Sequence, residues 1–225
     1  MFRKNLYKKL LHQANALKSN QNGVAYLEFA LILPLLLTLL VGSIEVTRLV
    51  LFNQKMENAT ANIADVVTRL DSETVTCSGP RGLKDVRENL LVEMMRPYDF
   101  NENGGSMIVS AIEAHYGNPK QPNDNETLRQ TVAWQWQSGG NASRIGAEGS
   151  PASGAEWPLV FRRSPNDGGM YNNDRVIAVE TFYDYKPIFP GVENFLDIDA
   201  VTQVYKKAFY RARFGKMSQL ADDCS

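Results

Sequence analysis

The sequence lacks the residue patterns on which most enzymes depend. Its 225 residues include two histidines, His12 and His115, and two cysteines, and they contain no Gly-x-Ser-x-Gly, His-Glu-x-x-His, phosphate-loop or Cys-x-x-Cys motif. An isolated histidine on a predicted strand is more often hydrogen-bonded within the fold than catalytic. We therefore expect a protein that is not an enzyme and that uses no cofactor.

Acidic side chains are absent from residues 1–23, which carry five basic ones. The rest of the chain holds 19 basic and 25 acidic side chains and is therefore net negative. Proteins that bind nucleic acid neutralise phosphates with lysine and arginine, so an acidic domain has no electrostatic basis for such binding. We exclude nucleic acid as a partner and treat residues 1–23 as a basic leader.

A long apolar run follows the basic leader. The 21 residues from Val24 to Ile44 contain one charged side chain, Glu28. As a helix that rises about 1.5 Å per residue, this run spans the roughly 30 Å hydrocarbon core of a bilayer. Because the basic residues lie on its N-terminal side, we predict a cytoplasmic leader, a transmembrane helix over residues 24–45 and export of the chain beyond it.

The helical pattern continues past the apolar run as an amphipathic stalk, residues 46–76. No glycine or proline interrupts residues 43–70. Apolar side chains recur there with spacings of three and four and form one helical stripe: Leu49, Phe52, Met56, Ala59, Ile63, Val66 and Leu70. We expect the distal half of the stripe to pack on the protein's own sheet, with helix-to-helix packing in a filament as the alternative for other turns.

The exported domain is predicted over residues 77–225. A helical pattern over residues 82–96 ends before Pro97. Four later segments alternate apolar and polar side chains as strands do: 107–116, 131–137, 175–185 and 201–214. Because no clear crossover helices separate them, we predict the α+β class, with the long N-terminal helix packed on a roughly four-stranded antiparallel sheet and one further helix. The sheet face that carries Trp134 and Trp136 should lie under the helices.

The lone acid of the apolar run lies in a recognisable context, Asn22-Gly23-Val24-Ala25-Tyr26-Leu27-Glu28-Phe29-Ala30. This segment resembles the TadE-like family of the tight-adherence (Flp-type) pilus system, in which a basic leader precedes Gly-x-x-x-x-Glu-Phe-Ala and a leucine-rich run with proline. The matching stretch covers residues 23–70 and includes Glu45 and Asn53-Gln54-Lys55. A second, looser likeness covers residues 179–187.

The resemblance implies a minor pilin or pseudopilin that acts in biogenesis of a tight-adherence type IV pilus and has a pilin-like fold. A prepilin peptidase would cut between Gly23 and Val24 on the cytoplasmic side. The new amine of Val24 would lie one helical turn from Glu28, a carboxylate favoured near a helix N-terminus. Glu28, with Phe29, would then set the register of the helix during assembly.

The resemblance also implies partners and a location. The partners would be the prepilin peptidase, other pilins or pseudopilins, the inner-membrane pilus assembly machinery and the membrane itself. The protein would lie in the bacterial inner membrane, with a cytoplasmic N-terminus and a periplasmic C-terminal domain. Incorporation into the extracellular pilus remains open, as does a role as an assembly factor.

Three alternatives compete with this interpretation. A secretory signal could be cut after Val41-Gly42-Ser43 or just beyond, and a plain signal anchor would not be cut at all. The third alternative is a membrane-anchored periplasmic binding module that is not processed at Gly23 and that meets a ligand through Trp134, Trp136 and its loops. The mature N-terminus distinguishes cleavage at Gly23 from all three.

The two cysteines, Cys77 and Cys224, both lie in the part predicted to be exported. Thiols in a bacterial periplasm are normally oxidised, so we predict a disulfide between them. Such a bond would close a loop of nearly 150 residues, for which chain entropy gives about 4 to 5 kcal/mol as an upper figure. It would attach the C-terminal tail to the base of the exported domain.

The loop over residues 164–174 collects oxygen donors, with Asp167 and Asp174 as the carboxylates that could bind calcium. The loop lacks the spacing of an EF-hand. Runs of Asn, Asp and Gly are usually solvated turns, in which glycine and asparagine accept positive φ angles. We therefore assign no metal and keep these two aspartates as a weak calcium candidate.

Overall fold

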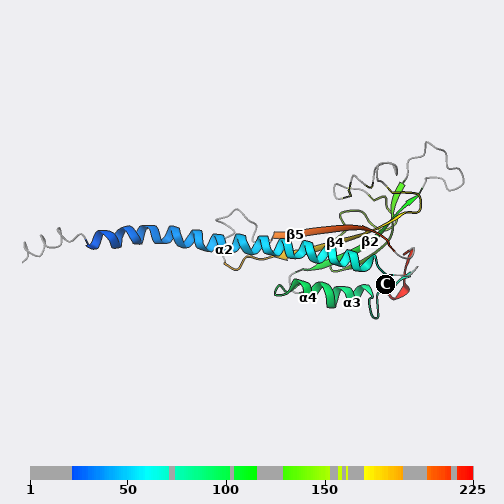
Figure 1. Ribbon diagram of the computed structural model, residues 1–225, viewed down its shortest axis with the longest axis horizontal. Coiled ribbons are helices and arrows are strands. Elements are labelled where there is room, and N and C mark those ends of the chain that lie inside the picture. Colours follow the sequence, from blue (N-terminus) through cyan, green and yellow to red (C-terminus); the bar gives the residue numbers. More distant parts are fainter. Residues whose placement is uncertain are drawn as a thin grey trace, which may run out of the picture.

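A single long helix organises the computed structural model, which describes residues 22–70, 74–101, 104–115, 129–152, 157–158, 161, 170–189, 202–213 and 217–224. Helix α2 (Asn22–Val67) comprises 46 residues and continues through Pro34. Its first half extends away from the rest of the described structure, and its second half lies against the C-terminal domain (Figure 1). Of the predicted stalk, residues 46–67 are helical, and the remainder contains a turn and a short strand.

A second helical segment follows in three consecutive pieces. These are α3 (Leu83–Asp85), a π-helical stretch η1 (Val86–Leu91) and α4 (Val92–Met95), within the helix predicted over residues 82–96. The segment starts after Gly82, where the backbone passes so close to Cys77 that a Cβ would collide with the carbonyl oxygen of Cys77. Glycine is therefore required at this turn.

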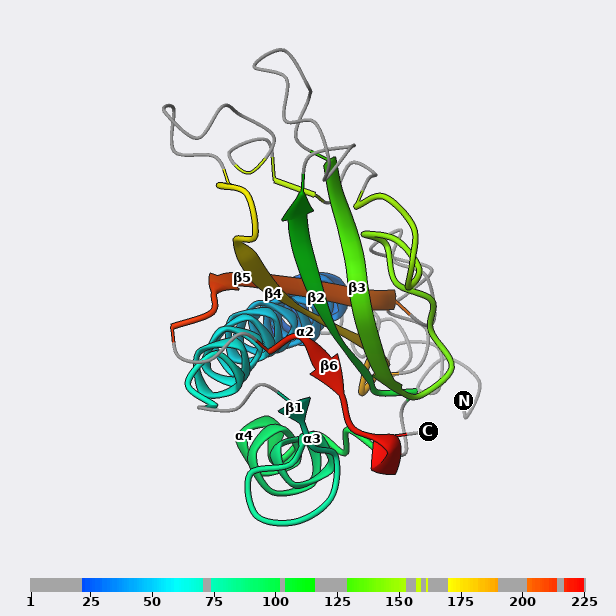
Figure 2. The ribbon, with the colours of Figure 1, turned by 90° about the vertical axis from the view of Figure 1, so that its right-hand side faces the viewer.

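The main sheet has four strands in the order β3-β2-β4-β5, and every neighbouring pair is antiparallel. The strands are β2 (Ser106–His115), β3 (Arg129–Ser138), β4 (Arg175–Tyr185) and β5 (Thr202–Arg211). Helix α2 lies over β4 and β5 (Figure 2). The α+β class and the antiparallel sheet predicted from the strand pattern are confirmed.

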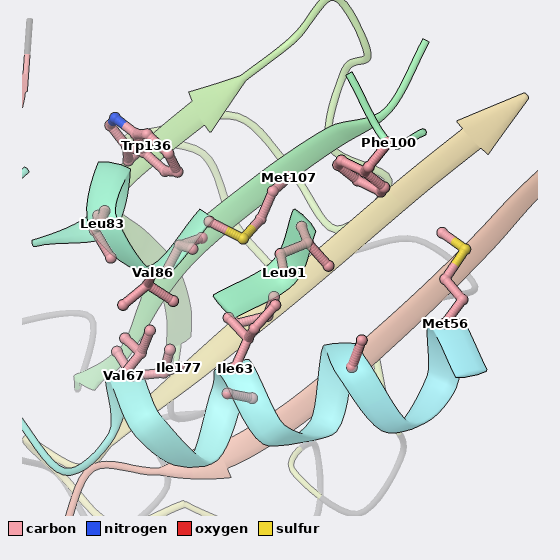
Figure 3. Close-up of a cluster of buried hydrophobic side chains, with 14 of the residues drawn as sticks. Met56, Ile63, Val67, Leu83, Val86, Leu91, Phe100, Met107, Trp136 and Ile177 are labelled. Carbon is pink, nitrogen blue, oxygen red and sulfur yellow. The ribbon is translucent and has the colours of Figure 1, made fainter. Parts of the chain in front are cut away.

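The main core lies between the helices and one face of this sheet (Figure 3). From α2 it receives Phe52, Met56, Ala59 and Ile63, all fully buried, so the distal part of the stripe packs on the protein's own sheet as expected. Trp134 and Trp136 enter the same core from β3, on the face predicted for them. A smaller core on the opposite face is built around Trp157.

A second, two-stranded sheet joins residues from the two ends of the C-terminal domain. Strand β1 (Thr74–Val75) pairs in parallel with β6 (Gln219–Leu220), and a single 3-10 turn, η4 (Asp222–Cys224), follows β6. Neither strand was predicted, because two residues are too few to show an alternating pattern. The pairing brings the C-terminal tail to the start of the second helical segment.

Candidate functional site

The projecting half of α2 presents an apolar surface that no other described part of the protein covers. The large apolar side chains between Val24 and Leu40 are mostly exposed, and the most apolar stretch of the helix has no buried residue. Water is an unfavourable environment for a surface of this size and composition. The length and composition of the helix suit a bilayer, and we treat this half as a membrane anchor.

The residues singled out by the sequence motif lie at the free end of this anchor. Gly23 and Val24 are in the first described turn of α2. A Cβ at Gly23 would meet no atom within 4 Å. Glu28 and Phe29 are exposed one turn further on, and within the described residues the Glu28 carboxylate has no hydrogen-bond or ionic partner.

A different acid of α2 is buried where the anchor meets the domain. Glu45 is 2% exposed and accepts two hydrogen bonds, from the Tyr185 hydroxyl at 2.9 Å and from the backbone N–H of Ile188 at 3.2 Å. The Arg48 guanidinium lies 3.9 Å from the same carboxylate. Burial and the hydrogen bond to Glu45 raise the pKa of Tyr185 to about 12. These contacts fasten the end of β4 to the helix.

Further along α2, the helix is locked to the sheet by polar contacts within the core. The Thr60 and Thr181 hydroxyls are 2.6 Å apart, and both residues are fully buried. The Thr60 hydroxyl donates to the carbonyl oxygen of Met56 at 2.7 Å, so it accepts the hydrogen bond from the Thr181 hydroxyl, and each hydroxyl has a partner. Buried hydroxyls of this kind tolerate little displacement, because a shifted helix would leave them unpaired. The domain therefore moves with the helix.

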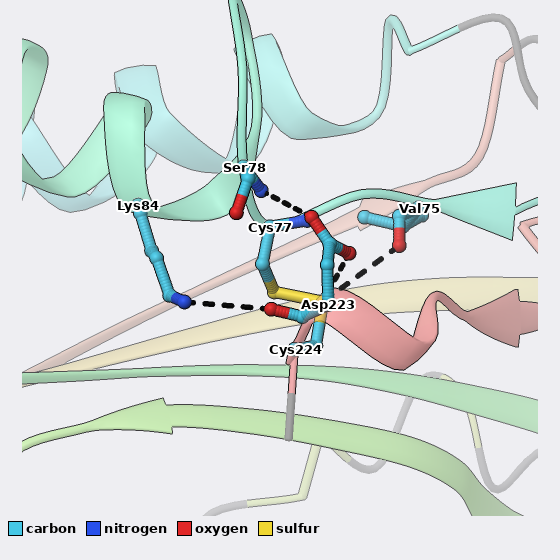
Figure 4. The surroundings of a disulfide bond; sticks show 6 residues. All are labelled: Val75, Cys77, Ser78, Lys84, Asp223 and Cys224. Atoms are coloured by element: carbon cyan, nitrogen blue, oxygen red, sulfur yellow. Dashed lines mark hydrogen bonds between the residues drawn. A yellow bond between two sulfur atoms is a disulfide. The ribbon is translucent and has the colours of Figure 1, made fainter.

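The predicted disulfide is present and forms part of a larger clasp (Figure 4). Cys77 and Cys224 are bonded, with their Cα atoms 5.0 Å apart. The neighbouring Asp223 carboxylate accepts hydrogen bonds from the backbone N–H groups of Ser78 at 2.6 Å and Cys77 at 3.2 Å. Those two bonds hold the pKa of Asp223 below its ordinary value. The clasp closes the domain at the end opposite Glu45.

The two tryptophans that a binding module would offer to a ligand are inside the core. Trp134 and Trp136 are both buried, and Trp134 Nε1 donates to the carbonyl oxygen of Met217 at 2.8 Å. The structure thus gives both side chains a packing role.

The opposite face of the sheet carries a buried carboxylate, Glu180. It accepts hydrogen bonds from the Tyr205 hydroxyl at 2.8 Å, from the backbone N–H of Arg144 at 2.9 Å and from the Ser143 hydroxyl. The Arg144 guanidinium lies over the Tyr205 ring, 4.3 Å from its centroid. This network holds the segment after β3 against the sheet.

The calcium candidate stays a prediction. Asp167 lies outside the described residues. Asp174 accepts a hydrogen bond from the Arg175 N–H at 3.0 Å and lies 3.4 Å from the Arg211 guanidinium. In the part of the chain that the structure describes, no three His, Cys, Asp or Glu side chains converge as metal ligands would.

The sequence reasoning missed the roles of Glu45, Glu180 and Asp223. Glu45 was noted only as part of the resemblance, although an acid directly after an apolar run is a signal of a buried or interfacial partner. Glu180 interrupts the apolar pattern of a central strand, which is a similar signal. Asp223 offered no signal beyond its place beside Cys224.

Comparison with known proteins gives one match. Residues 23–65 match the model of a family described as TadE-like protein. No curated protein and no solved structure matches the chain. The matched segment starts at the glycine of the motif and covers the projecting half of α2, Glu45 and most of the packed half. Residues 23–65 are therefore similar to the TadE-like family, and this similarity points toward the tight-adherence pilus system.

Proposed function

We propose that the protein is a minor pilin or pseudopilin that acts in biogenesis of a tight-adherence type IV pilus. The observation that carries the proposal is that the TadE-like match coincides with the helix whose first half is apolar and uncovered. The role is structural rather than catalytic. It depends on a helix that can exchange a lipid environment for the helices of other subunits.

Maturation by a prepilin peptidase would prepare this helix for assembly. A cut between Gly23 and Val24 removes the basic leader and creates an amine one turn before Glu28. Glu28 has no partner among the described residues, so it is available to the amine of its own chain or of a neighbouring subunit. In a low-dielectric environment such a pair selects one register, because a misplaced helix would leave a charge unpaired.

The proposed location follows from the orientation of α2, with the basic leader on the cytoplasmic side of the membrane. The leader lies in the cytoplasm, α2 crosses the bacterial inner membrane and the domain lies in the periplasm, where the Cys77–Cys224 bond is oxidised and stable. The partners are the prepilin peptidase, other pilins or pseudopilins and the inner-membrane assembly machinery. A binding module built on Trp134 and Trp136 is not favoured, because both side chains are buried in the core.

Substitution at Gly23 tests the maturation step. Gly23→Arg should block cleavage, since a long side chain prevents close approach of the peptide bond to the protease, and the leader should persist in the intact mass. Gly23→Ala is the matched control for the fold, because a Cβ at this position meets no atom within 4 Å. Normal processing of Gly23→Arg would overturn the proposed cleavage site.

Substitution at Glu28 tests the assembly step. Glu28→Ala should insert into the membrane normally and reduce piliation, because the register-setting charge is lost. Glu57→Ala is the matched control, since Glu57 is an exposed acid on the same helix with a 3.7 Å ion pair to Lys206. Equal piliation in both variants would remove the role given to Glu28.

A further inference from the structure

The hydrogen bond between Glu45 and Ile188 fixes the height of one loop relative to the membrane anchor. The Ile188 N–H donates to Glu45 Oε2 at 3.2 Å, and Glu45 directly follows the apolar run that ends at Ile44. Cα–Cβ bonds in a helix tilt toward its N-terminus, which is the membrane side here. The segment after β4 therefore lies at the level where the hydrocarbon core ends.

Ile188 is unusual in the described part of the exported domain. Outside α2, the described residues include two large hydrophobic side chains that are mostly exposed, Ile188 at 52% and Tyr171 at 56%. Tyr171 precedes β4 and therefore lies at the opposite end of that strand, far from the anchor. Ile188 follows the end of β4 that contacts Glu45. The apolar side chain is exposed at the height where a bilayer surface would meet it.

The helix also carries exposed apolar side chains just above Glu45. Val46, Val50 and Leu51 are exposed. At about 1.5 Å per residue they extend up to roughly 9 Å beyond Glu45, comparable with the 5 to 8 Å that headgroups add to each side of the hydrocarbon core. Glu45 itself is shielded from that region by its burial. An exposed carboxylate at this height would be repelled by lipid phosphates, and the burial of Glu45 avoids this repulsion.

One exposed cation completes the arrangement. Lys186 lies two residues before Ile188 and is exposed. Basic side chains at this height can reach lipid phosphates while their aliphatic stems lie on apolar surface. An exposed isoleucine two residues from an exposed lysine at the membrane boundary is chemically suited to an anionic lipid surface.

We propose that Ile188, with Lys186, Val46, Val50 and Leu51, forms a membrane-contacting collar through which the domain rests on the bilayer that α2 crosses. The inference rests on the proposed membrane anchoring of α2 and adds a second point of contact. The domain then has a defined orientation on the membrane before assembly. Extraction of the helix must also lift Ile188 out of the lipid interface.

Site-directed labelling of the full chain tests the collar. Cysteine is introduced singly at Ile188, Tyr171 or Leu35 and labelled with an environment-sensitive fluorophore; the native cysteines do not react, because they are bonded to each other. The labelled protein is reconstituted into vesicles of phosphatidylethanolamine and phosphatidylglycerol that contain lipids with nitroxides at the headgroup or deep in the acyl chain. Both Ile188 and Tyr171 are exposed, so equal unfolding curves are expected for the labelled variants.

The expected pattern separates the two contacts. The Leu35 label should be quenched several-fold by the deep nitroxide, the Ile188 label several-fold by the headgroup nitroxide, and the Tyr171 label by neither. Quenching at Leu35 without quenching at Ile188 would overturn the collar and leave the anchor intact. Absence of quenching at Leu35 would overturn the membrane anchor itself, and the collar with it. An Ile188 signal that depends on protein density and not on the nitroxide would indicate a second copy and also overturn the collar.

Discussion

The two halves of helix α2 have similar backbones and opposite surroundings. Phe29, in the projecting half, is 58% exposed, and Phe52, in the packed half, is fully buried among the rings of Tyr98, Tyr183 and Tyr185. Apart from Glu28, the first half is apolar around most of its circumference, whereas the second half has one buried apolar stripe. The distribution of apolar side chains around the helix therefore indicates which environment each half occupies.

Glu45 lies at the junction of the two halves and explains how one helix accommodates both. The charge is buried, yet its two carboxylate oxygens have donors from the end of β4 and the residues after it. A buried carboxylate without such donors would be strongly unfavourable. The domain thus stabilises the helix at the point where the lipid-facing surface gives way to the protein core.

The largest expected effect is the difference in stability between two single substitutions, Phe52→Ala and Phe29→Ala. Phe52→Ala should lower the free energy of unfolding of the domain by about 3 to 5 kcal/mol, because it removes a fully buried ring and leaves a cavity. Phe29→Ala should leave domain stability unchanged. Chemical unfolding of the full chain in detergent measures both, and equal effects would contradict the division of the helix into two environments.

Loss of the disulfide should act on the end of the domain opposite the membrane. The double variant Cys77→Ser/Cys224→Ser should lower the free energy of unfolding by about 2 to 5 kcal/mol. Hydrogen exchange should accelerate most at the Ala221 N–H, which bonds to the Val75 carbonyl oxygen at 2.9 Å. The Ile188 N–H, at the Glu45 end, is the internal reference. Equal acceleration at both positions would show that the two ends are not independent.

The Glu45 junction can be weakened without creating a cavity. Tyr185→Phe removes one donor to a buried carboxylate and should cost about 1 to 3 kcal/mol. Tyr171→Phe, at an exposed position, is the matched control. Stability unchanged in Tyr185→Phe would mean that Glu45 does not fasten the domain to the helix.

Tyr185 should also make the stability of the fold depend on pH in the alkaline range. The pKa of Tyr185 is about 12 in the folded protein and near 10 when unfolded, so the folded state favours the protonated hydroxyl. The stability that this shift contributes is complete below pH 10 and is lost as the pH rises toward 12. The difference in tyrosinate absorbance between wild type and Tyr185→Phe should titrate near pH 12; a midpoint near 10 would contradict the buried hydrogen bond.

The smallest effect concerns the clasp around Asp223. Its pKa is lowered in the folded protein, so the hydrogen bonds to the Ser78 and Cys77 N–H groups contribute above the ordinary carboxyl pKa of 3.8 and are lost as the pH falls through the lower folded value. In Asp223→Asn, the free energy of unfolding should fall less steeply than in the wild type as the pH drops through the folded-state pKa of Asp223. If the free energy of unfolding of Asp223→Asn depends on acidic pH as that of the wild type does, the Asp223 carboxylate does not contribute to stability.

The elements with strong periodicity were predictable from the sequence. The strand over residues 175–185 was predicted with the bounds that the structure shows. The two tryptophans of β3 were predicted on the correct face, because alternation identifies the buried side. Strand β5 is shorter than its predicted range, 201–214, since alternating side chains do not mark where the hydrogen-bonded ladder stops. The β1–β6 pair was not predictable, because its two short strands are far apart in the chain.

The candidate site was predictable only where residues lie close together in the sequence. Gly23, Val24 and Glu28 form a local motif, and the family match begins at the same glycine. The partners of Glu45 lie about 140 residues further along the chain, so only the folded structure could identify them. Asp223 likewise acts on backbone groups that the disulfide and the β1–β6 pair bring to it.

The mature N-terminus tests the central claim most directly. Intact-mass analysis of the wild-type protein extracted from bacterial membranes should give a chain that begins at Val24 and retains one disulfide. A chain that begins at Met1, or near Glu45 after cleavage as a secretory signal, would contradict the assignment of the helix as a pilin assembly element.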